Sequence, residues 1–506
     1  MELPRKTHAN AWVFQIVLRT LFSCSIFSFR PGGMVLGGVC SFKQDRCRVR
    51  RNLYLLWFVG LLCISGCMAE SPLAVEEAAG AEEALTLDEL GHAIHGGLLF
   101  QFETFDGNDR TCGTCHLVTS RFDLAPEDVQ RAFAEDPNDP MFRPVDADVE
   151  GGGTYDRIRE DGLVRVHVVL APNVTVDEVD GVNVQVRPDG RYVVALRRAT
   201  PTSINSALND HLMWDGREGT DLAHQALSAA LDHAEALRLP TESELADIAF
   251  FQEQLFSSTA LREYAHGGPE PTLPHGRNDS EERGRAFVLD EPLSASAGTH
   301  GLCATCHAGP MLNRTGHFNP GDPADLPFSG NRTSQFNRRG LPEYTYRITL
   351  ASDHLNDNPR IGPIGMPMWP AGTTRVLHSP DPGALVVDTD PSDGTDGPAN
   401  PCITTAACLV AEPGGATEFH RMPTLWGSAR TAPYFHDNSA ATFEDVALHY
   451  REFFAPTQAS MYAQAAFMES IGQLEIATAI RDEDDALTIT DQDVTDIAAY
   501  MRYAFR

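Results

Sequence analysis

Two short segments of the chain each place two cysteines and a histidine within five consecutive positions. The first is Cys-Gly-Thr-Cys-His at 112–116, and the second is Cys-Ala-Thr-Cys-His at 303–307. With 11 cysteines and 18 histidines in 506 residues, random placement would give only about 0.01 matches to this pattern. The repeated pattern therefore restricts, more than any other feature, what the chain can fold around.

Paired cysteines serve zinc sites, redox-active disulfides and covalently attached haem. In C-x-x-C-H the two thiols can add to the vinyl groups of one haem while the histidine supplies an axial nitrogen to its iron. A redox disulfide gives the histidine no role, and zinc needs four ligands from well-spaced pairs. We therefore predict two haem c groups, with zinc as the alternative. The expected attachment residues are Cys112, Cys115 and His116 for the first haem, and Cys303, Cys306 and His307 for the second.

A chain with covalently attached haem is expected to be exported, and its N-terminal part carries a fitting signal. Arg50 and Arg51 precede an apolar run over 53–62 that is too short to span a bilayer. The following Ile-Ser-Gly-Cys resembles the lipobox of bacterial lipoproteins, so Cys67 would carry the lipid. Met68 stands where an Asp would retain a lipoprotein in the inner membrane. We expect an outer-membrane lipoprotein facing the periplasm, with a soluble periplasmic protein as the alternative.

The charge of the chain agrees with this placement. Its formal net charge is −31, and the expected leader is basic, so the remainder is more acidic still. Such a surface excludes nucleic acid as a partner and favours a basic protein, for example a small cytochrome. In an oxidising compartment Cys402 and Cys408 could form a loop disulfide, and free loop thiols are the alternative.

An internal duplication follows the two motifs. The segments PTSINSALNDHLMWDGREGT from Pro201 and PTLWGSARTAPYFHDNSAAT from Pro423 share residues at the same offsets, with Trp214 and His436 at matching positions. Each is followed by an apolar helical pattern opened by a threonine, at Thr241 and at Thr490. Two copies of one haem-binding unit explain these repeats best. The expected organisation is a leader at 1–66, an acidic tether at 67–84, a first unit at 85–275 with a β insertion at about 160–198, and a second unit at 276–506 with an irregular loop insertion at about 318–417.

From about residue 85 to residue 506, the chain resembles the bacterial diheme cytochrome c peroxidase and MauG superfamily. The resemblance rests on the two C-x-x-C-H motifs, on PTSINSALNDHLMWDGRE, and on RMPTLWGSARTAPYFHDNSAATFEDVALHY after the second motif. It implies a mainly α fold of two cytochrome c-like helical domains, each with one covalent haem. It also implies that the N-terminal haem meets hydrogen peroxide, while the C-terminal haem exchanges electrons with it.

The resemblance assigns roles around the first haem. Trp214 matches the aromatic residue that lies between the haems, Glu235 the distal carboxylate, and Gln225 the neighbouring distal glutamine. A carboxylate in that place can move a proton between the two peroxide oxygens. Ala229 stands where the family has a distal proline. These matches predict Glu235, Gln225 and Trp214 as the catalytic group.

One departure concerns the sixth position of the first iron. Family peroxidases often carry a capping histidine soon after the first motif, but no histidine occurs between His116 and His167. The first haem is therefore expected to be open. His92, His95 and His211 are the candidates for a sixth ligand that would close it.

The second haem and a calcium site complete the expectations. Tyr450 stands where the peroxidases place a methionine ligand, as in MauG-like members, and a phenolate favours ferric over ferrous iron. Packing beside haem is the alternative role for this tyrosine. Thr431 and Pro433 match the carbonyl donors of the family's calcium, but Ala199 replaces the asparagine donor.

The resulting hypothesis is an exported diheme oxidoreductase of the MauG-like branch that reacts with hydrogen peroxide and shares oxidising equivalents between its haems. One alternative is a cytochrome c peroxidase that takes electrons from a small cytochrome or cupredoxin. A second, from another class, is a diheme electron carrier without a substrate site.

Overall fold

The computed structural model divides the chain into two compact units, Met1–Glu83 and Ala84–Arg506. It describes residues 85–148, 153–289, 303, 307–314, 328–331, 337–349, 354–355, 367–369, 374–384, 386, 418–474, 477–478 and 488–506. The expected leader, the tether with Cys67, the attachment residue Cys306 and the pair Cys402 and Cys408 lie outside the described residues. The described helices and strands all belong to the second unit.

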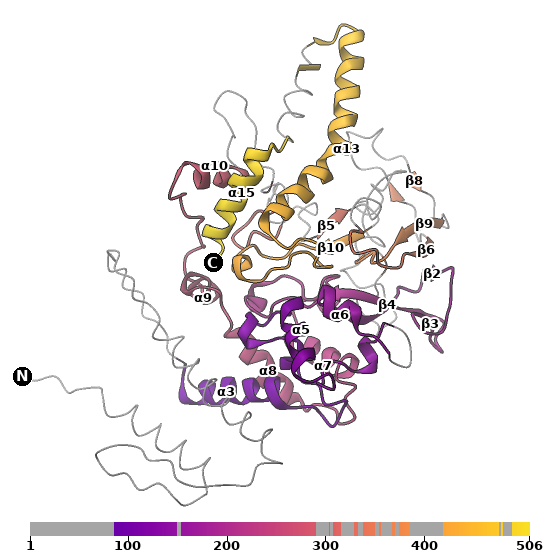
Figure 1. The fold of residues 1–506 in the computed structure, drawn as a ribbon, viewed down its shortest axis with the longest axis vertical. Helices are drawn as coiled ribbons and strands as arrows, with labels where there is room; N and C mark the ends of the chain where they lie inside the picture. The colour runs from indigo at the N-terminus through magenta and orange to yellow at the C-terminus, as the bar shows by residue number, and fades with distance from the viewer. Residues whose placement is uncertain are drawn as a thin grey trace, which may run out of the picture. The chain divides into compact units, whose positions relative to one another are not determined.

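Helices make up most of the regular structure, with small sheets added (Figure 1). The α-helices are α3 (Leu87–Phe102), α4 (Cys112–Cys115), α5 (Pro126–Glu135), α6 (Asp156–Asp161), α7 (Leu222–Asp232), α8 (Glu242–Glu253), α9 (Thr259–Ala265), α10 (Asp279–Val288), α13 (Phe443–Ser470) and α15 (Asp491–Ala504). Short 3-10 turns are η1 (Val118–Ser120), η2 (Pro144–Asp146), η3 (Ser206–Leu208) and η6 (Ser428–Arg430). Among these described helices, none combines the length and the apolar character that crossing a membrane requires.

The strands lie in two insertions and form small antiparallel sheets. Within the first insertion, β4 (Tyr192–Ala199) pairs with β1 (Leu163–Val169) and with β3 (Val184–Val186). A second sheet has the order β2 (Val174–Val176), β6 (Tyr344–Thr349) and β9 (Thr374–Ser379). The remaining pairs are β5 (Phe328–Asn331) with β10 (Glu418–Arg421), and β7 (His354–Leu355) with β8 (Pro367–Trp369).

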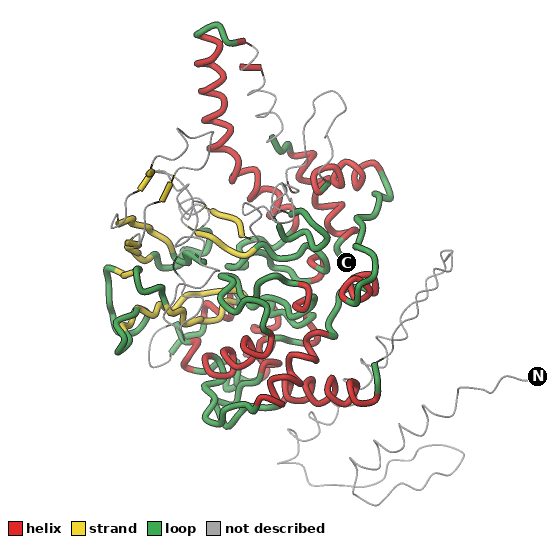
Figure 2. Tube along the Cα trace, turned by 180° about the vertical axis from the view of Figure 1, so that it is seen from behind, coloured by secondary structure: helices red, strands yellow, loops and turns green. Residues whose placement is uncertain are grey.

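The strands correct one expectation. We expected an irregular loop region over about 318–417, but its described residues include β5 to β9. In addition, β2 of the first insertion pairs with β6 of the second, for example Val174 with Ile348. The two insertions therefore share a sheet and an apolar core, and Figure 2 shows the strands gathered on one side of this unit. This pairing is long-range, so local sequence patterns could not reveal it.

Threonine caps fix the helix starts that the sequence predicted. Thr241 and Thr490 each accept a hydrogen bond from the backbone three residues on, and the acidic residue there, Glu244 or Asp493, returns one. Thr86 and Thr442 cap α3 and α13 in the same way. These reciprocal bonds satisfy backbone N–H groups that a helix start leaves without partners.

Each repeat contains one close helix crossing, α3 on α8 and α10 on α15, visible in Figure 1. At the first crossing, a Cβ on Gly96 would lie 1.8 Å from the carbonyl oxygen of Asp247. At the second, a Cβ on Gly284 would lie 2.0 Å from the carbonyl oxygen of Asp496. Only glycine permits backbones to approach this closely. In both crossings, a glycine therefore permits the close backbone contact.

The duplication also appears in the backbone between the motifs and the last helices. Left-handed conformations recur in matched pairs at Asn205 and Gly427, at Met213 and Phe435, and at Gly216 and Asn438. Each pair has the separation that relates Pro201 to Pro423. The hydroxyl groups of Thr202 and Thr424 each donate to a backbone carbonyl just after their C-x-x-C-H motif, at Arg121 and Met311. The sequence repeat is therefore a structural repeat.

Candidate functional site

The first motif forms α4, a single turn over Cys112–Cys115 that His116 follows as C-cap. The His116 backbone N–H donates to the carbonyl of Cys112 at 2.9 Å. Its side-chain Nδ1 lies 3.0 Å from the carbonyl oxygen of Phe122 and 3.3 Å from Oγ of Ser203. A carbonyl only accepts, so Nδ1 carries the hydrogen and Nε2 keeps a free lone pair. This is the tautomer that an axial iron ligand needs.

An aromatic cluster surrounds His116. The ring of Phe100 lies 5.8 Å from the imidazole and packs against Phe122 and Phe251. Burial lowers the pKa of His116 to about 4, because a charged imidazolium would be poorly solvated there. The ring is therefore neutral at physiological pH and available to a metal.

The second motif repeats this arrangement. The backbone N–H of His307 donates to the carbonyl of Cys303 at 2.7 Å, and its Nδ1 lies 2.8 Å from the carbonyl oxygen of Leu312. The side chain is buried, and burial lowers its pKa. His307 is thus held in the same tautomer as His116, with the Nε2 lone pair available. Cys306 lies outside the described residues.

The thiols of the first motif are half-buried and neutral. Burial raises the pKa of Cys112 to about 12 and that of Cys115 to about 11. Within the described residues, neither thiol belongs to a group of three or more converging histidine, cysteine or carboxylate ligands. A zinc site at this motif would need such a group. Two thiols beside one ligand histidine fit covalent haem instead.

Each motif opens into a large cavity. The first cavity is lined by Cys112, Cys115 and His116 and has about 1260 Å³ of empty space, including solvent at its mouth. The second is lined by Cys303, His307 and Tyr450 and has about 2000 Å³, counted in the same way. Both are lined largely by apolar side chains, as a porphyrin requires. The residues and the space therefore fit one haem per motif.

One wall is common to both cavities. The residues that line both are Ala199, Thr200, Pro201, Thr202, Asn209, Trp214 and Arg421. Trp214 donates from Nε1 to the carbonyl of Ala199 at 2.9 Å, and its ring meets that of His436 edge-on with centroids 6.4 Å apart. Trp214 thus lies in the wall that the two cavities share.

Helix α7 forms one side of the first cavity. Gln225, Ala226, Ala229 and Ala230 lie on one face of the helix and line the cavity, so small side chains leave room there. His233, the residue at the end of this helix, lines the cavity as well. No hydrogen bond to its ring occurs among the described residues, and burial lowers its pKa. Sequence reasoning missed His233, although it lies two residues from Glu235.

Glu235 is not among the residues that line the first cavity. Its carboxylate is exposed and accepts a 2.7 Å hydrogen bond from Nδ2 of Asn108. The backbone at Glu235 is left-handed, with φ of 49°, and Asn108 also donates to the carbonyl of His233. The structure therefore brings Gln225 and Trp214 to the cavity and leaves Glu235 outside it.

The three histidines proposed as sixth ligands do not line the first cavity either. His92 and His95 lie on α3, where each Nδ1 meets a carboxylate oxygen of Asp247 at 2.5 and 2.6 Å. Their side chains are more than half exposed. These two histidines therefore belong to the helix crossing rather than to the cavity. His211 is not a lining residue of either cavity.

Helix α13 brings two polar residues to the second cavity, Tyr450 and its neighbour His449. Their rings are nearly perpendicular, with centroids 5.4 Å apart. Burial lowers the pKa of His449 to about 3, so its imidazole is neutral. The cavity thus offers two side chains able to bind iron, of which the sequence had singled out only Tyr450.

The expected calcium donors lie at the second cavity. Thr431 and Pro433 both line it. Ala199 has no side-chain oxygen, and its carbonyl already accepts the hydrogen bond from Trp214. Calcium at this place therefore lacks the third donor that the family resemblance would supply.

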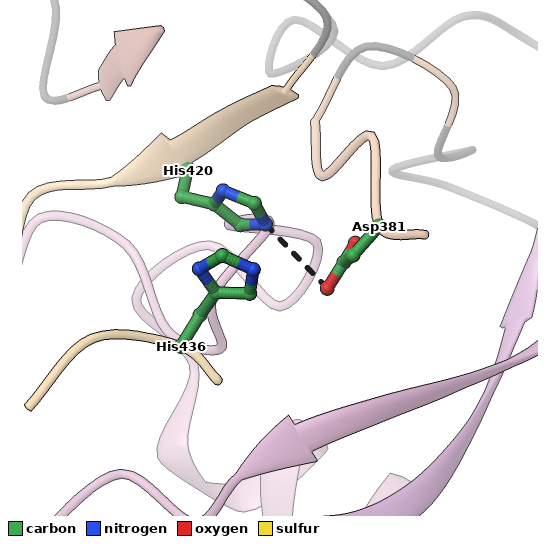
Figure 3. Close-up of side chains that lie close together, drawn as sticks. All are labelled: Asp381, His420 and His436. Atoms are coloured by element: carbon green, nitrogen blue, oxygen red, sulfur yellow. Dashed lines mark ion pairs between the residues drawn. The ribbon is translucent and has the colours of Figure 1, made fainter. Parts of the chain in front are cut away.

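A buried polar cluster lies beside Trp214. Figure 3 shows Asp381, His420 and His436, whose candidate ligand atoms lie within 4.8 Å of one another. The two imidazoles are stacked, with centroids 3.8 Å apart and 17° between the planes. A metal in the plane of one ring would lie out of the plane of the other, and Asp381 already binds Arg198 through both oxygens. The cluster therefore compensates Arg198 rather than converging on a metal.

Similarity to known proteins is found among solved structures rather than among family models or curated proteins. No protein-family model matches the chain, and no curated protein matches it. The structure is similar to the crystal structure of a MauG-like protein associated with microbial copper homeostasis, at 15% identity and a TM-score of 0.35. That likeness covers 86% of this chain and 95% of the other. At this level it decides neither the family nor the reaction.

Proposed function

We propose that the chain is a diheme c-type oxidoreductase that reacts with hydrogen peroxide in the first cavity and shares oxidising equivalents with the second. One observation carries the proposal. Two cavities each contain a C-x-x-C-H histidine whose Nδ1 is fixed by a backbone carbonyl, and the cavities share a wall that contains Trp214.

Haem bound at the first motif would supply the iron that reduces peroxide. The protein's own contribution begins with His116, which the Phe122 carbonyl and the aromatic cluster hold in one tautomer. On the α7 side, Ala226, Ala229 and Ala230 leave room for a small substrate. These features support an open first site rather than a site closed by a protein ligand.

Two polar side chains of the α7 side reach the first cavity. Gln225 can donate its amide hydrogens to a peroxide oxygen. His233 is neutral, so it can accept a proton from one peroxide oxygen and return it to the other. We assign proton transfer to His233 in preference to Glu235, because only His233 lines the cavity.

Trp214 would connect the two sites. Its indole N–H is held by Ala199, and its backbone carbonyl accepts from the N–H of Arg421 at 2.8 Å. These bonds keep the ring in the common wall. An aromatic ring in this place offers electrons a path shorter than the route around the wall.

In the second cavity, we propose Tyr450 as the ligand opposite His307, with His449 as the alternative. A phenolate would stabilise ferric iron and suit a site that stores oxidising equivalents. A cytochrome c peroxidase fed by a small cytochrome or cupredoxin remains the second candidate. His92 and His95 are bound to Asp247, so these two histidines do not close the first site as an electron carrier would require.

Export, lipid anchoring at Cys67, calcium at Thr431 and Pro433, and a basic electron-donor protein or a protein substrate are further parts of the proposal. The signal at 50–67 supports export and the lipid anchor, and the acidic composition supports a basic protein partner. Cys67→Ala should move the protein from the membrane fraction to the soluble fraction. A membrane-bound Cys67→Ala protein would contradict the anchor.

The haem content tests the proposal as a whole. Protein produced with a cytochrome c maturation system should keep two haems per chain after denaturation and extraction with acidified organic solvent. Haem that is extracted, a single retained haem, or stoichiometric zinc would contradict the proposal.

A further inference from the structure

Arg421 is a buried cation in the wall that the two cavities share. It ends β10, and its side chain is 7% exposed. Nε donates to the carbonyl of Met213 at 3.1 Å, but Nη1 is buried without a hydrogen-bond partner among the described residues. Burying a charged group without an opposite charge costs several kcal/mol. Arg421 therefore requires an explanation.

Two other buried arginines of the unit, Arg198 and Arg110, show what a completed site looks like. Arg198 binds Asp381 with two hydrogen bonds and Asp215 with a third. Arg110 pairs with Asp146 at 2.6 Å. These guanidinium groups are neutralised by carboxylates of equal burial.

No such carboxylate meets Arg421 among the described residues. The acid that acts on it, Asp210, is already bound by Arg314 at 2.6 Å. Burial lowers the pKa of Arg421 to about 10, because the charged form is poorly solvated. The protein alone therefore leaves this cation unsatisfied.

Arg421 lines both the first and the second cavity. We infer that Arg421 binds the propionate carboxylates of both haems and so acts as a cofactor-binding residue common to the two sites. This inference rests on the proposed function, since haem brings the carboxylates. A guanidinium presents several donors in a planar fork and can serve two carboxylates, which an ammonium group does less well.

This role has an electrostatic consequence for both cofactors. A positive charge beside each haem favours the ferrous state, whose net charge is more negative. Arg421 also holds the backbone of Trp214 through its N–H. One residue therefore affects both irons and the position of the ring between them.

The experiment compares Arg421→Gln, Arg421→Lys and the control Arg347→Gln in holoprotein. Arg347 is exposed, pairs with Asp177 and lines neither cavity. Haem content is measured first, and each haem is then titrated by spectroelectrochemistry. Arg421→Gln should lower the ratio of ferrous to ferric haem at a fixed potential by about tenfold for both haems, the scale of one unit charge inside a protein. Arg421→Lys should lower it less, and Arg347→Gln should not change it.

The outcomes separate this inference from the proposed function. Wild-type protein without two covalent haems would overturn the function itself. Two haems whose potentials do not respond to Arg421→Gln, or respond no more than to Arg347→Gln, would overturn only the role of Arg421. A shift confined to one haem would overturn the shared role. If Arg421→Gln does not accumulate, Arg421→Lys is measured in its place. A lower ratio of ferrous to ferric haem at both haems supports the inference, and an unchanged ratio contradicts it.

Discussion

The two repeats of the molecule share a frame and differ in the walls of their cavities. In each, a glycine brings two helices into backbone contact, at Gly96 and at Gly284, and a C-x-x-C-H histidine donates from Nδ1 to a backbone carbonyl. The first cavity is then bordered by α7, with alanines, Gln225 and His233. The second is bordered by α13, with His449 and Tyr450.

This difference indicates how one duplicated unit can serve two roles. The frame fixes the C-x-x-C-H histidine of each repeat, so under the proposed function it would determine where haem binds. The remaining wall of each cavity would then determine which side chains face the haem. Small side chains with one neutral imidazole favour an open, reactive site, whereas a tyrosine and a histidine from one helix favour a closed one.

The largest effect should come from removing one attachment site at a time. Replacing Cys112 and Cys115 by alanine should leave one covalent haem and abolish the reaction with peroxide. Replacing Cys303 and Cys306 should also leave one haem, but peroxide should still react at the first site. Mass spectrometry and stopped-flow absorption measure these outcomes. Equal loss of peroxide reaction in both variants would contradict the division of roles.

His233, which lines the first cavity, and Glu235, which does not, are the two candidates for the proton-transfer group. His233→Gln should slow the reaction with peroxide by about 10² to 10⁴, the usual contribution of such a group. Glu235→Gln should have the smaller effect, because its carboxylate lies outside the cavity and binds Asn108. Stopped-flow rates over a range of peroxide concentrations compare the two. The reverse order would return the role to Glu235.

Because the two repeats share a frame, Gly→Ala substitution should reduce the stability of the protein equally at the two helix crossings. Gly96→Ala and Gly284→Ala should each destabilise the protein by about 1–3 kcal/mol or more, because the new Cβ would collide with a backbone carbonyl. Gly91→Ala lies on the same helix as Gly96 with open space around it and should be neutral or stabilising by up to about 1 kcal/mol. Urea unfolding measures all three. A tolerated Gly96→Ala would show that the crossing is not close.

The smallest expected effect is a difference between the two helix crossings in how their stability depends on pH. Asp247 binds His92 and His95, whereas Asp496 binds Ser280 and Arg283. The hydrogen bond and charge of Asp247 raise the pKa of His92 above 6.5. A raised pKa means that this stabilisation is complete below about pH 6.5 and is lost as the pH rises through the raised value.

Asp247→Asn should therefore destabilise the protein more at pH 5.5 than at pH 8.5. Asp496→Asn should destabilise it equally at both values, because Arg283 stays charged throughout. Thermal unfolding at the two pH values compares the variants. A pH-independent cost for Asp247→Asn would show that His92 does not pair in its charged form.

Much of the frame could be predicted from the sequence because it depends on local patterns. The caps Thr241 and Thr490 and the matched positions after Pro201 and Pro423 follow from neighbouring residues, and the structure shows both. Trp214 and His436 hold matching positions in the repeat, and the structure adds that their rings are in contact.

The cavity walls were harder to predict because they depend on which way a side chain points. Glu235 and His233 are two residues apart, but only His233 lines the cavity. The left-handed backbone at Glu235 turns the chain at this point. His449 and Tyr450 are adjacent and both line the second cavity. Arg421 begins the second segment that carries the resemblance, but the sequence alone assigns it no role, since the lack of a carboxylate partner among the described residues shows only in the structure.

Electron paramagnetic resonance of the oxidised holoprotein tests most directly the claim that one frame holds two different sites. We predict one high-spin ferric signal from the first site and one low-spin signal with His307 and Tyr450 as ligands. Tyr450→Phe should remove the low-spin signal and leave the high-spin one unchanged. Two low-spin signals of bis-histidine type, or spectra that do not respond to Tyr450→Phe, would contradict the account.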